Sequence, residues 1–323
     1  MLYPLKFKPI YKERIWGGRK IETVFGKKLP ETEKIGESWE LSGVDGDISV
    51  VANGKLKGNN LQELIEIYMG DLVGDKVFEK YGEEFPLLIK LIDADDNLSI
   101  QVHPDDKLAA ERHHSFGKTE MWYVVGHEPD ARLYLGFNQP VDKEKYLKYL
   151  EAGKLAELLN AYKVEDGDSY FIPAGTIHAI GKGLLIAEIQ QTSDITYRVF
   201  DWNRVDPKTG KGRELHTALA LDAIEYKARS DYKTVAAPRT NAPVTLEKCP
   251  YFQTNSLIVD GTAERDYAPL DSFVILICLD GKLELEYEGG TETLKKGETV
   301  LIPAEMNEIT LKGNGKTLEV YVP

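Results

Sequence analysis

Short apolar runs bounded by glycine, aspartate and proline recur along the chain, and this pattern predicts a protein built mainly from β-strands. Apolar side chains recur at helical spacing in only three places, so we expect small helical inserts over about residues 61–82, 143–162 and 215–226. Strands do not alternate with helices, which favours the mainly-β class over an α/β fold. The clearest strand runs are residues 121–125, 131–135, 169–172, 184–189, 273–279 and 282–287.

One segment of the chain occurs twice, and this repeat predicts two domains of related topology. Residues 167–174 read GDSYFIPA and residues 297–304 read GETVLIPA, so each copy combines a Gly-acidic turn, a short strand and a proline at the strand end. Each copy follows a strand–turn–strand stretch, which before the second copy is predicted to turn at Asp280 and Gly281. We therefore expect two β-barrel domains with a boundary in the polar stretch 229–250.

The two copies differ where a site would lie. Counting from the shared proline, His178 in the first copy corresponds to Glu308 in the second, and no histidine occurs beyond residue 235. We divide the chain into a catalytic, metal-binding domain over residues 1–235 and a degenerate domain over residues 236–323 that lacks a metal site.

Composition and charge exclude several classes of protein. The 323 residues are 42% hydrophobic and carry a net charge of −13, so apolar cores are expected and no basic excess exists to neutralise nucleic-acid phosphates. No apolar run of about 18 residues predicts a membrane span, and the first residues do not follow the pattern of a signal peptide. Two cysteines make no disulfide framework. We expect a cytoplasmic enzyme without nucleic-acid or membrane partners, although a local basic pocket for a small anionic substrate remains open.

Four polar residues on predicted strands form a candidate metal site. Gln101 and His103 are two positions apart, so on a strand both side chains point to the same face. Glu120 opens the next strand run, and His178 follows the turn after the first repeat copy. Two imidazoles, one carboxylate and one amide oxygen suit a divalent metal such as zinc, with a position left open for water or substrate.

The spacing Gly167-x5-Pro173-x-Gly175-x2-His178 resembles the second motif of the cupin superfamily, and residues 101–120 resemble a variant of its first motif. More specifically, the chain resembles the type I phosphomannose isomerases in their shorter bacterial form, over about residues 3–323 and weakly in the last quarter. The matching stretches are residues 36–40, 99–106, 117–122, 173–179 and 188–198.

This resemblance implies two cupin-type, jelly-roll barrels and a metal-dependent isomerase that interconverts D-mannose 6-phosphate and D-fructose 6-phosphate. It implies one zinc ion per chain and a sugar phosphate as the partner molecule. By resemblance the metal ligands are Gln101, His103, Glu120 and His178; the catalytic residues are Arg198, Lys118 and Asp194; and the substrate-binding residues are Lys90, Ser99, Lys118, Glu188 and Arg198.

The chemistry of the isomerisation fits these residue types. Moving a proton between C1 and C2 through an enediol requires a cationic group near the developing negative charge, a base and a phosphate clamp. Three candidates for the base remain: a metal-bound hydroxide, Asp194 and Glu188. Arg198 is expected to act electrostatically, because the pKa of arginine stays above about 12.

Two departures from the longer members of the family change the expectations. Those members carry a histidine directly before the lysine that matches Lys118, whereas this chain has Gly117 at that position. Any proton-transfer role of that histidine therefore cannot be transferred to this chain. The helical insert between Glu120 and Gly167 is also short. We therefore expect weaker exclusion of unphosphorylated sugars.

Two alternatives of other classes stay open. Two histidines and one glutamate also form the iron site of cupin oxygenases, and the fold could instead serve a non-catalytic sugar-phosphate-binding protein. The sequence is compatible with a monomer or a homodimer.

Overall fold

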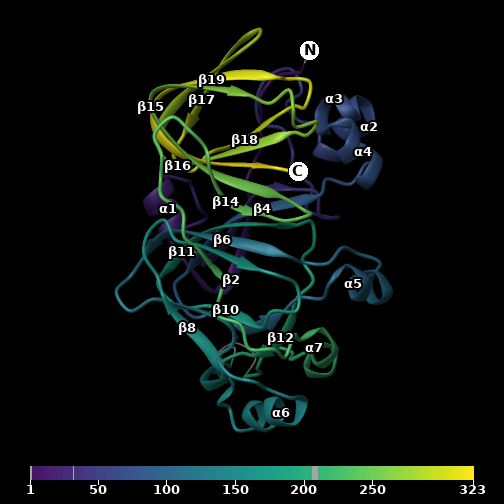
Figure 1. Ribbon diagram of the computed structural model, residues 1–323, viewed down its shortest axis with the longest axis vertical. Helices are drawn as coiled ribbons and strands as arrows, with labels where there is room; N and C mark the ends of the chain where they lie inside the picture. Colours follow the sequence, from purple (N-terminus) through teal and green to yellow (C-terminus); the bar gives the residue numbers. More distant parts are fainter. Residues whose placement is uncertain (1, 32, 206–209) are drawn as a thin grey trace.

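Three antiparallel β-sheets make up the computed structural model, which describes residues 2–31, 33–205 and 210–323 (Figure 1). The middle sheet has the strand order β13 (Lys233–Thr234), β9 (Ser169–Ile172), β6 (Glu120–His127), β11 (Leu184–Gln191), β4 (Leu87–Ala94), β3 (Ile35–Ser42) and β2 (Ile10–Gly18). A five-stranded sheet lies on one side, with the order β12 (Tyr197–Phe200), β5 (Ile100–Val102), β10 (His178–Ile180), β7 (Arg132–Phe137) and β8 (Leu159–Lys163).

The third sheet is built mainly from the C-terminal quarter of the chain and lies on the opposite side of the middle sheet (Figure 1). Its strand order is β1 (Leu5–Lys6), β18 (Thr299–Ile302), β16 (Val274–Tyr287), β19 (Glu308–Tyr321), β15 (Gln253–Asp266) and β14 (Val244–Lys248), with β17 (Gly290–Lys295) pairing with β16.

The middle sheet is buried on both faces, and every residue of β4 and β11 is buried. One face packs Ile92 and Ile186 against the five-stranded sheet, whereas the other packs Leu91 against residues of β16 such as Ile275. Strands buried on both faces read as nearly continuous apolar runs, so polar residues within them are informative. In these two strands Lys90, Glu188 and Gln190 alternate with the apolar positions and share the face of Ile92 and Ile186.

The predicted mainly-β, cupin-like architecture is confirmed, with one difference in detail. The sheets do not close into barrels but face one another as open layers. Both repeat copies form four-residue strands, β9 and β18, and each follows a glycine with positive φ, Gly167 at 95° and Gly297 at 82°. His178 and Glu308 are each the first residue of the next strand, so their correspondence in the repeat also holds in space.

Two predicted local structures are wrong. Asp280 and Gly281 do not form a turn but lie inside the continuous strand β16, where a bulge shifts the pairing with β19. The backbone there allows no side chain at Gly281, whose Cβ would lie 2.1 Å from the carbonyl oxygen of Asn314. Residues 159–162, expected as helix, form strand β8 because the edge of β7 pairs with them.

The helical inserts are largely where the sequence predicts them. The first contains α2 (Leu61–Tyr68), α3 (Gly70–Val73) and α4 (Asp75–Tyr81); the second contains α6 (Lys143–Glu151) and the 3-10 turn η1 (Leu155–Leu158); the third is the shorter α7 (Thr217–Ala223). Two short helices were not predicted, α1 (Lys20–Phe25) and α5 (Asp106–His113). Among the described helices, none is both long and apolar enough to cross a membrane.

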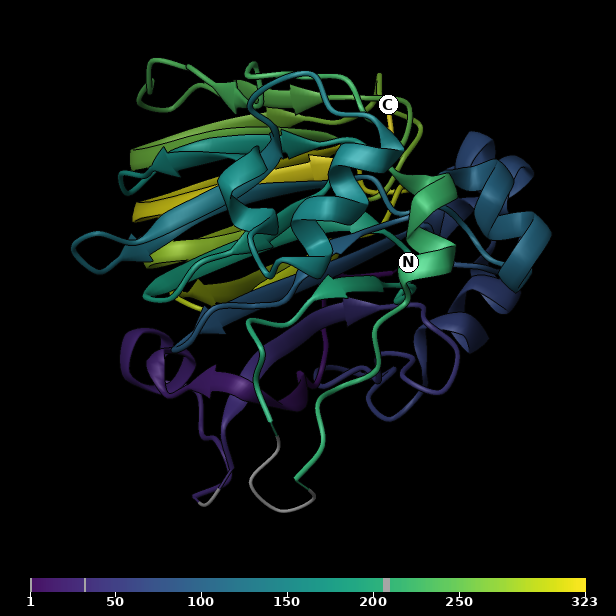
Figure 2. The same cartoon turned by 90° about the horizontal axis from the view of Figure 1, so that it is seen from below.

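Helices α6 and α7 cover the outer face of the five-stranded sheet, which Figure 2 shows from that side. Tyr146 of α6 and Ala220 of α7 belong to the same apolar cluster as Ile100, Val102 and Val199 of the sheet. The opposite face of the five-stranded sheet therefore faces the middle sheet.

The division of the chain at residues 235 and 236 stays a prediction. Strand β1 (Leu5–Lys6) pairs with β18, so two residues of the predicted first domain belong to the sheet of the C-terminal quarter.

Candidate metal centre and its cavity

The predicted metal ligands come together between the middle sheet and the five-stranded sheet. Gln101 is the central residue of β5, and His178 at the start of β10 is its direct cross-strand partner. His103 follows β5, and Glu120 begins β6 in the opposite sheet. The candidate ligand atoms of His103, Glu120 and His178 lie within 4.8 Å of one another, and all three residues are buried. The amide nitrogen of Gln101 lies 3.3 Å from Nε2 of His178.

Backbone carbonyls fix both imidazole rings in the orientation that metal binding requires. The Nδ1–H of His103 donates to the carbonyl of Ile195 at 2.9 Å, and the Nδ1–H of His178 donates to the carbonyl of Thr176 at 2.8 Å. The Nε2 atoms therefore keep their lone pairs and face the centre. Burial lowers the pKa of His178 to about 4 and that of His103 well below its usual range, so both rings stay neutral.

Glu120 is the clearest indication that this centre holds a cation. Both carboxylate oxygens are buried and accept no hydrogen bond. Burial, together with repulsion from Glu188, raises the pKa of Glu120 to about 7. Its neighbours are Nε2 of His178 at 3.4 Å, Nε2 of His103 at 3.6 Å and Nζ of Lys118 at 3.2 Å. One lysine offsets only part of the cost of burying a carboxylate that accepts no hydrogen bond, and a metal ion held with two neutral imidazoles offsets more of it.

A cavity of about 270 Å³ opens beside this centre, and all predicted catalytic and substrate-binding residues line it. It is unusually basic for a protein with a net charge of −13, because five cationic side chains face three carboxylates. The predicted residues that line it are Lys90, Ser99, Gln101, Lys118, Glu188, Asp194 and Arg198; the cations are Arg14, Lys90, Lys118, Arg198 and Arg213; and the carboxylates are Glu37, Glu188 and Asp194.

The two carboxylates considered as bases lie in different surroundings. Glu188 is buried, and its oxygens accept hydrogen bonds from Lys90 Nζ at 3.0 Å and from Trp122 Nε1 at 2.8 Å. Burial alone would raise the pKa of Glu188, but Lys90 and Lys118 outweigh it and lower the pKa. Asp194 is exposed at the edge of the cavity, and no donor within the described residues bonds to its carboxylate.

Sequence analysis missed six polar or aromatic residues of the cavity: Arg14, Trp16, Glu37, Trp39, Thr196 and Arg213. Arg14 donates to both oxygens of Glu37, at 3.0 and 3.2 Å, and Trp39 Nε1 donates to the same carboxylate at 2.7 Å. Burial would raise the pKa of Glu37, yet Lys90 and Arg14 lower it to about 2. Glu37 and Trp39 are two positions apart on a mostly buried strand, and this pattern could have indicated that both face a site. The sequence around Arg14 and Arg213 contains no comparable pattern.

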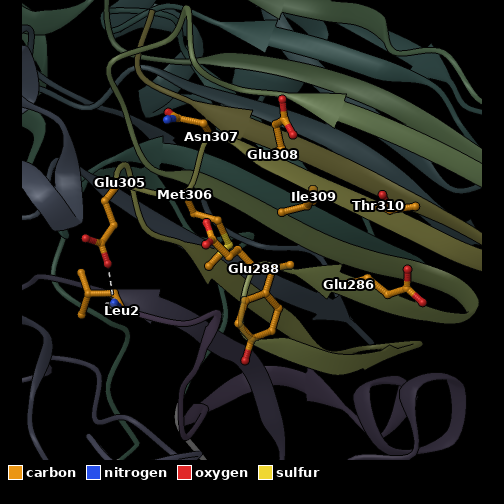
Figure 3. Close-up of a pocket in the computed structure, with 10 residues that line it drawn as sticks. Leu2, Glu286, Glu288, Glu305, Met306, Asn307, Glu308, Ile309 and Thr310 are labelled. Atoms are coloured by element: carbon orange, nitrogen blue, oxygen red, sulfur yellow. Dashed lines mark hydrogen bonds between the residues drawn. The ribbon is translucent and has the colours of Figure 1, made fainter.

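A larger cavity of about 790 Å³ lies in the C-terminal sheet, around the position that corresponds to His178 (Figure 3). Four glutamates line it, and its lining includes neither histidine nor any basic residue. Such a surface repels an anionic ligand and offers no imidazole to a metal. The lining residues are Leu2, Glu286, Tyr287, Glu288, Glu305, Met306, Asn307, Glu308, Ile309 and Thr310.

The cupin-like sheets and the convergence of two histidines, a glutamate and a glutamine between them define a cupin with a candidate metal centre. Residues 4–139 match the family model "Phosphomannose isomerase type I, catalytic domain", and residues 243–322 match "Mannose-6-phosphate isomerase, cupin domain". The chain belongs to the type I phosphomannose isomerase family.

Individual relatives agree with this assignment. The chain is 38% identical to the mannose-6-phosphate isomerase ManA of Bacillus subtilis, over 96% of both chains. It is 33% identical to the mannose-6-phosphate isomerase of Streptococcus mutans, over 94% of this chain and 93% of that one. The crystal structure of the mannose 6-phosphate isomerase from Bacillus subtilis superimposes with a TM-score of 0.89 at 36% identity and covers 99% of both chains.

Proposed function

We propose that this chain is an isomerase that interconverts D-mannose 6-phosphate and D-fructose 6-phosphate with one zinc ion per chain. The observation that carries the proposal is the orphaned carboxylate of Glu120 between two neutral imidazoles, at the wall of a basic cavity. The names of the relatives support the substrate. A cytoplasmic enzyme, either a monomer or a homodimer, remains part of the same proposal.

Gln101, His103, Glu120 and His178 would hold the zinc ion. When bound, zinc supplies a Lewis acid that polarises the sugar oxygens. The donor set fits this metal, because zinc prefers imidazole nitrogen and carboxylate oxygen and leaves a position open in catalytic sites.

The basic residues of the cavity are proposed to bind the substrate. Arg198 is the cross-strand partner of Gln101, so its side chain begins next to the metal centre, and its guanidinium donates to the carbonyl of Glu214 beside Arg213. Lys118 lies 3.2 Å from Glu120 and brings a positive charge to the point where negative charge develops. Lys90 is held by Glu188 and Gln190, at 3.0 and 2.6 Å, and Ser99 adds a hydroxyl to the same wall.

Asp194 is the carboxylate that we propose for proton transfer. A general base needs a free lone pair within reach of the substrate. Both oxygens of Glu188 already accept hydrogen bonds and its pKa is lowered, which makes it a weak base. The carboxylate of Asp194 has no donor within the described chain and lines the cavity. Glu188 is therefore proposed to position Lys90 rather than to move the proton.

The alternative functions lose support. An oxygenase needs open metal positions for O₂ and has no use for five cationic side chains in its cavity. A non-catalytic sugar-phosphate binder needs no arrangement that leaves two imidazoles and a carboxylate ready for a metal.

A coupled assay for fructose 6-phosphate formed from mannose 6-phosphate tests the proposal. Activity is expected in the isolated protein, is lost after treatment with a chelator and returns when zinc is restored. Folded, zinc-loaded protein that shows no turnover would contradict it. Oxygen consumption that depends on the substrate and on iron would support the oxygenase instead.

A further inference from the structure

Two arginines from different parts of the chain meet at the wall of the cavity. Arg198 belongs to β12, and Arg213 follows later in the chain. Asp201 binds Arg213 through two hydrogen bonds, from Nε at 2.8 Å and from Nη2 at 2.6 Å. This paired contact fixes the plane of the Arg213 guanidinium at the cavity.

Asp96 and Asp201 form ion pairs with Arg204 and Arg213, but Arg198 is not balanced in this way. Asp201 also accepts a hydrogen bond from Nη2 of Arg204 at 2.5 Å, so a single carboxylate serves two guanidinium groups. Arg198 forms no ion pair with any carboxylate in residues 2–31, 33–205 and 210–323; its side chain donates to the backbone carbonyl of Glu214 at 2.9 Å. Its Nε is fully buried and has no hydrogen-bond partner.

Burial, followed by the positive charge of Arg213, lowers the pKa of Arg198. Two like charges beside one another at a half-buried site destabilise each other unless an anion lies between or against them. The guanidinium of Arg198 lines the cavity, and within the described residues it has no carboxylate partner while its Nε makes no hydrogen bond. These observations point to an anionic ligand group at this end of the cavity.

We propose that Arg213, held in place by Asp201, is a specificity-determining residue that binds the phosphate group of the substrate together with Arg198. The proposal rests on the proposed function and deepens it, because it assigns the end of the cavity that takes the phosphate. Arg213 is the binding residue, and Asp201 is a positioning residue. A phosphate dianion carries the charge and the oxygen acceptors that a pair of guanidinium groups fits.

Arg204 provides a matched control. It shares the partner Asp201 with Arg213, but its other bonds go to the carbonyl of Asn97 at 2.5 Å and to Asp96 at 3.4 Å, and it does not line the cavity. Loss of Arg204 disturbs the same ion-pair cluster without removing a cation from the cavity.

The experiment compares Arg213→Gln, Arg213→Lys and Arg204→Gln with the wild type in the zinc-loaded protein. For Arg213→Gln we expect KM for mannose 6-phosphate to rise about 10- to 100-fold, while kcat stays within about threefold, because a charge-assisted contact to a non-reacting group is lost. The inhibition constant of inorganic phosphate rises by a similar factor. Arg213→Lys recovers part of both effects, and Arg204→Gln changes neither by more than about threefold. Asp201→Asn raises KM less than Arg213→Gln does.

An unchanged KM and an unchanged phosphate inhibition constant in folded Arg213→Gln would overturn the proposal. So would an equal loss in Arg204→Gln, because the effect would then come from the ion-pair cluster. Calorimetry with inorganic phosphate separates this proposal from the proposed function. If the wild type lacks isomerase activity but binds phosphate, and Arg213→Gln does not, the anion site stands and the isomerase fails. If the wild type binds no phosphate, the anion site fails.

Discussion

Two fully buried carboxylates, one in each half of the molecule, have opposite surroundings. Glu319 in β19 accepts four hydrogen bonds at 2.8–3.2 Å, from Arg265 Nε and Nη2, Tyr267 Oη and Asn255 Nδ2. Glu120 in β6 accepts none. Both side chains are 0% exposed, so burial alone does not distinguish them. The difference lies in what the protein provides: the fold gives Glu319 four hydrogen bonds, whereas it gives Glu120 only the ion pair with Lys118 at 3.2 Å and leaves room for a metal ion as a further partner.

The same contrast extends to the two repeat copies. His178 is buried and directed toward the metal centre, whereas Glu308 at the corresponding position is exposed beside an acidic cavity. One copy therefore carries groups suited to binding a metal and an anion, and the other has the same strand geometry without them. Four experiments test this difference, in order of decreasing expected effect.

Glu120→Gln should have the largest effect. We expect loss of the metal and a fall in activity of about 10³-fold, since the Lewis acid contributes several kcal/mol to the reaction. The metal-free variant should lose less stability, relative to the metal-free wild type, than Glu319→Gln loses, because Glu120 accepts no hydrogen bond and gives up only the ion pair with Lys118. Metal analysis, the coupled assay and urea unfolding measure these three quantities. A metal-free variant much less stable than the metal-free wild type would show that Glu120 is structural.

Glu319→Gln should have the opposite effects, with a loss of stability but no loss of metal or activity. Removing one partner of a buried ion pair leaves Arg265 uncompensated, so we expect the free energy of unfolding to fall by about 4 kcal/mol. Metal content and activity per folded molecule should not change. Urea unfolding and metal analysis check this expectation, and a loss of metal would remove the distinction between the two glutamates.

Glu37 extends the comparison to a third carboxylate, because it lies in the same half of the molecule as Glu120 but is a largely buried carboxylate with hydrogen-bond partners. Its pKa is lowered from 4.5 to about 2, so its charged form stabilises the folded state above the unfolded pKa. That stabilisation, about 3 kcal/mol, is lost as the pH falls from about 5 to about 2. The difference in unfolding free energy between the wild type and Glu37→Gln should shrink over this range. If the difference in unfolding free energy between the wild type and Glu37→Gln does not change with pH, the lowered pKa of Glu37 is contradicted.

Glu308→Gln should have the smallest effect. The side chain is exposed, so we expect a change in unfolding free energy within about 0.5 kcal/mol and no change in activity. Metal analysis of the wild type should give one ion per chain. A second stoichiometric ion that disappears in this variant would show that the second copy also kept a site.

The sequence predicted those parts of the site that depend on local spacing. Gln101 and His103 were paired by their two-residue separation, and His178 by the turn that precedes it. Arg14 and Arg213 could not be found in this way, because only the assembled sheets bring them to residues far away in the chain. Their local sequence is that of ordinary surface arginines.

The errors in secondary structure have similar causes. Helix α5 buries only Ala109 and so lacks an apolar face, although Asp105 caps its first turn by accepting a hydrogen bond from the backbone of Leu108. The Asp280–Gly281 pair is typical of a turn, and Gly281 does have a positive φ of 77°, but pairing with β19 on both sides makes the position a bulge inside β16. Tertiary pairing outweighed local preference in β8 for the same reason.

The pairing of β1 with β18 has a consequence for synthesis of the chain. Residues 5 and 6 leave the ribosome early, but their partners at 300 and 301 are among the last to be made. The apolar outer face of the middle sheet likewise waits for Phe273 and Ile275. At about 10 residues per second, that face stays uncovered for about ten seconds after residue 191 has been added. During this interval the nascent chain exposes a sheet surface that chaperones recognise and that neighbouring chains can bind.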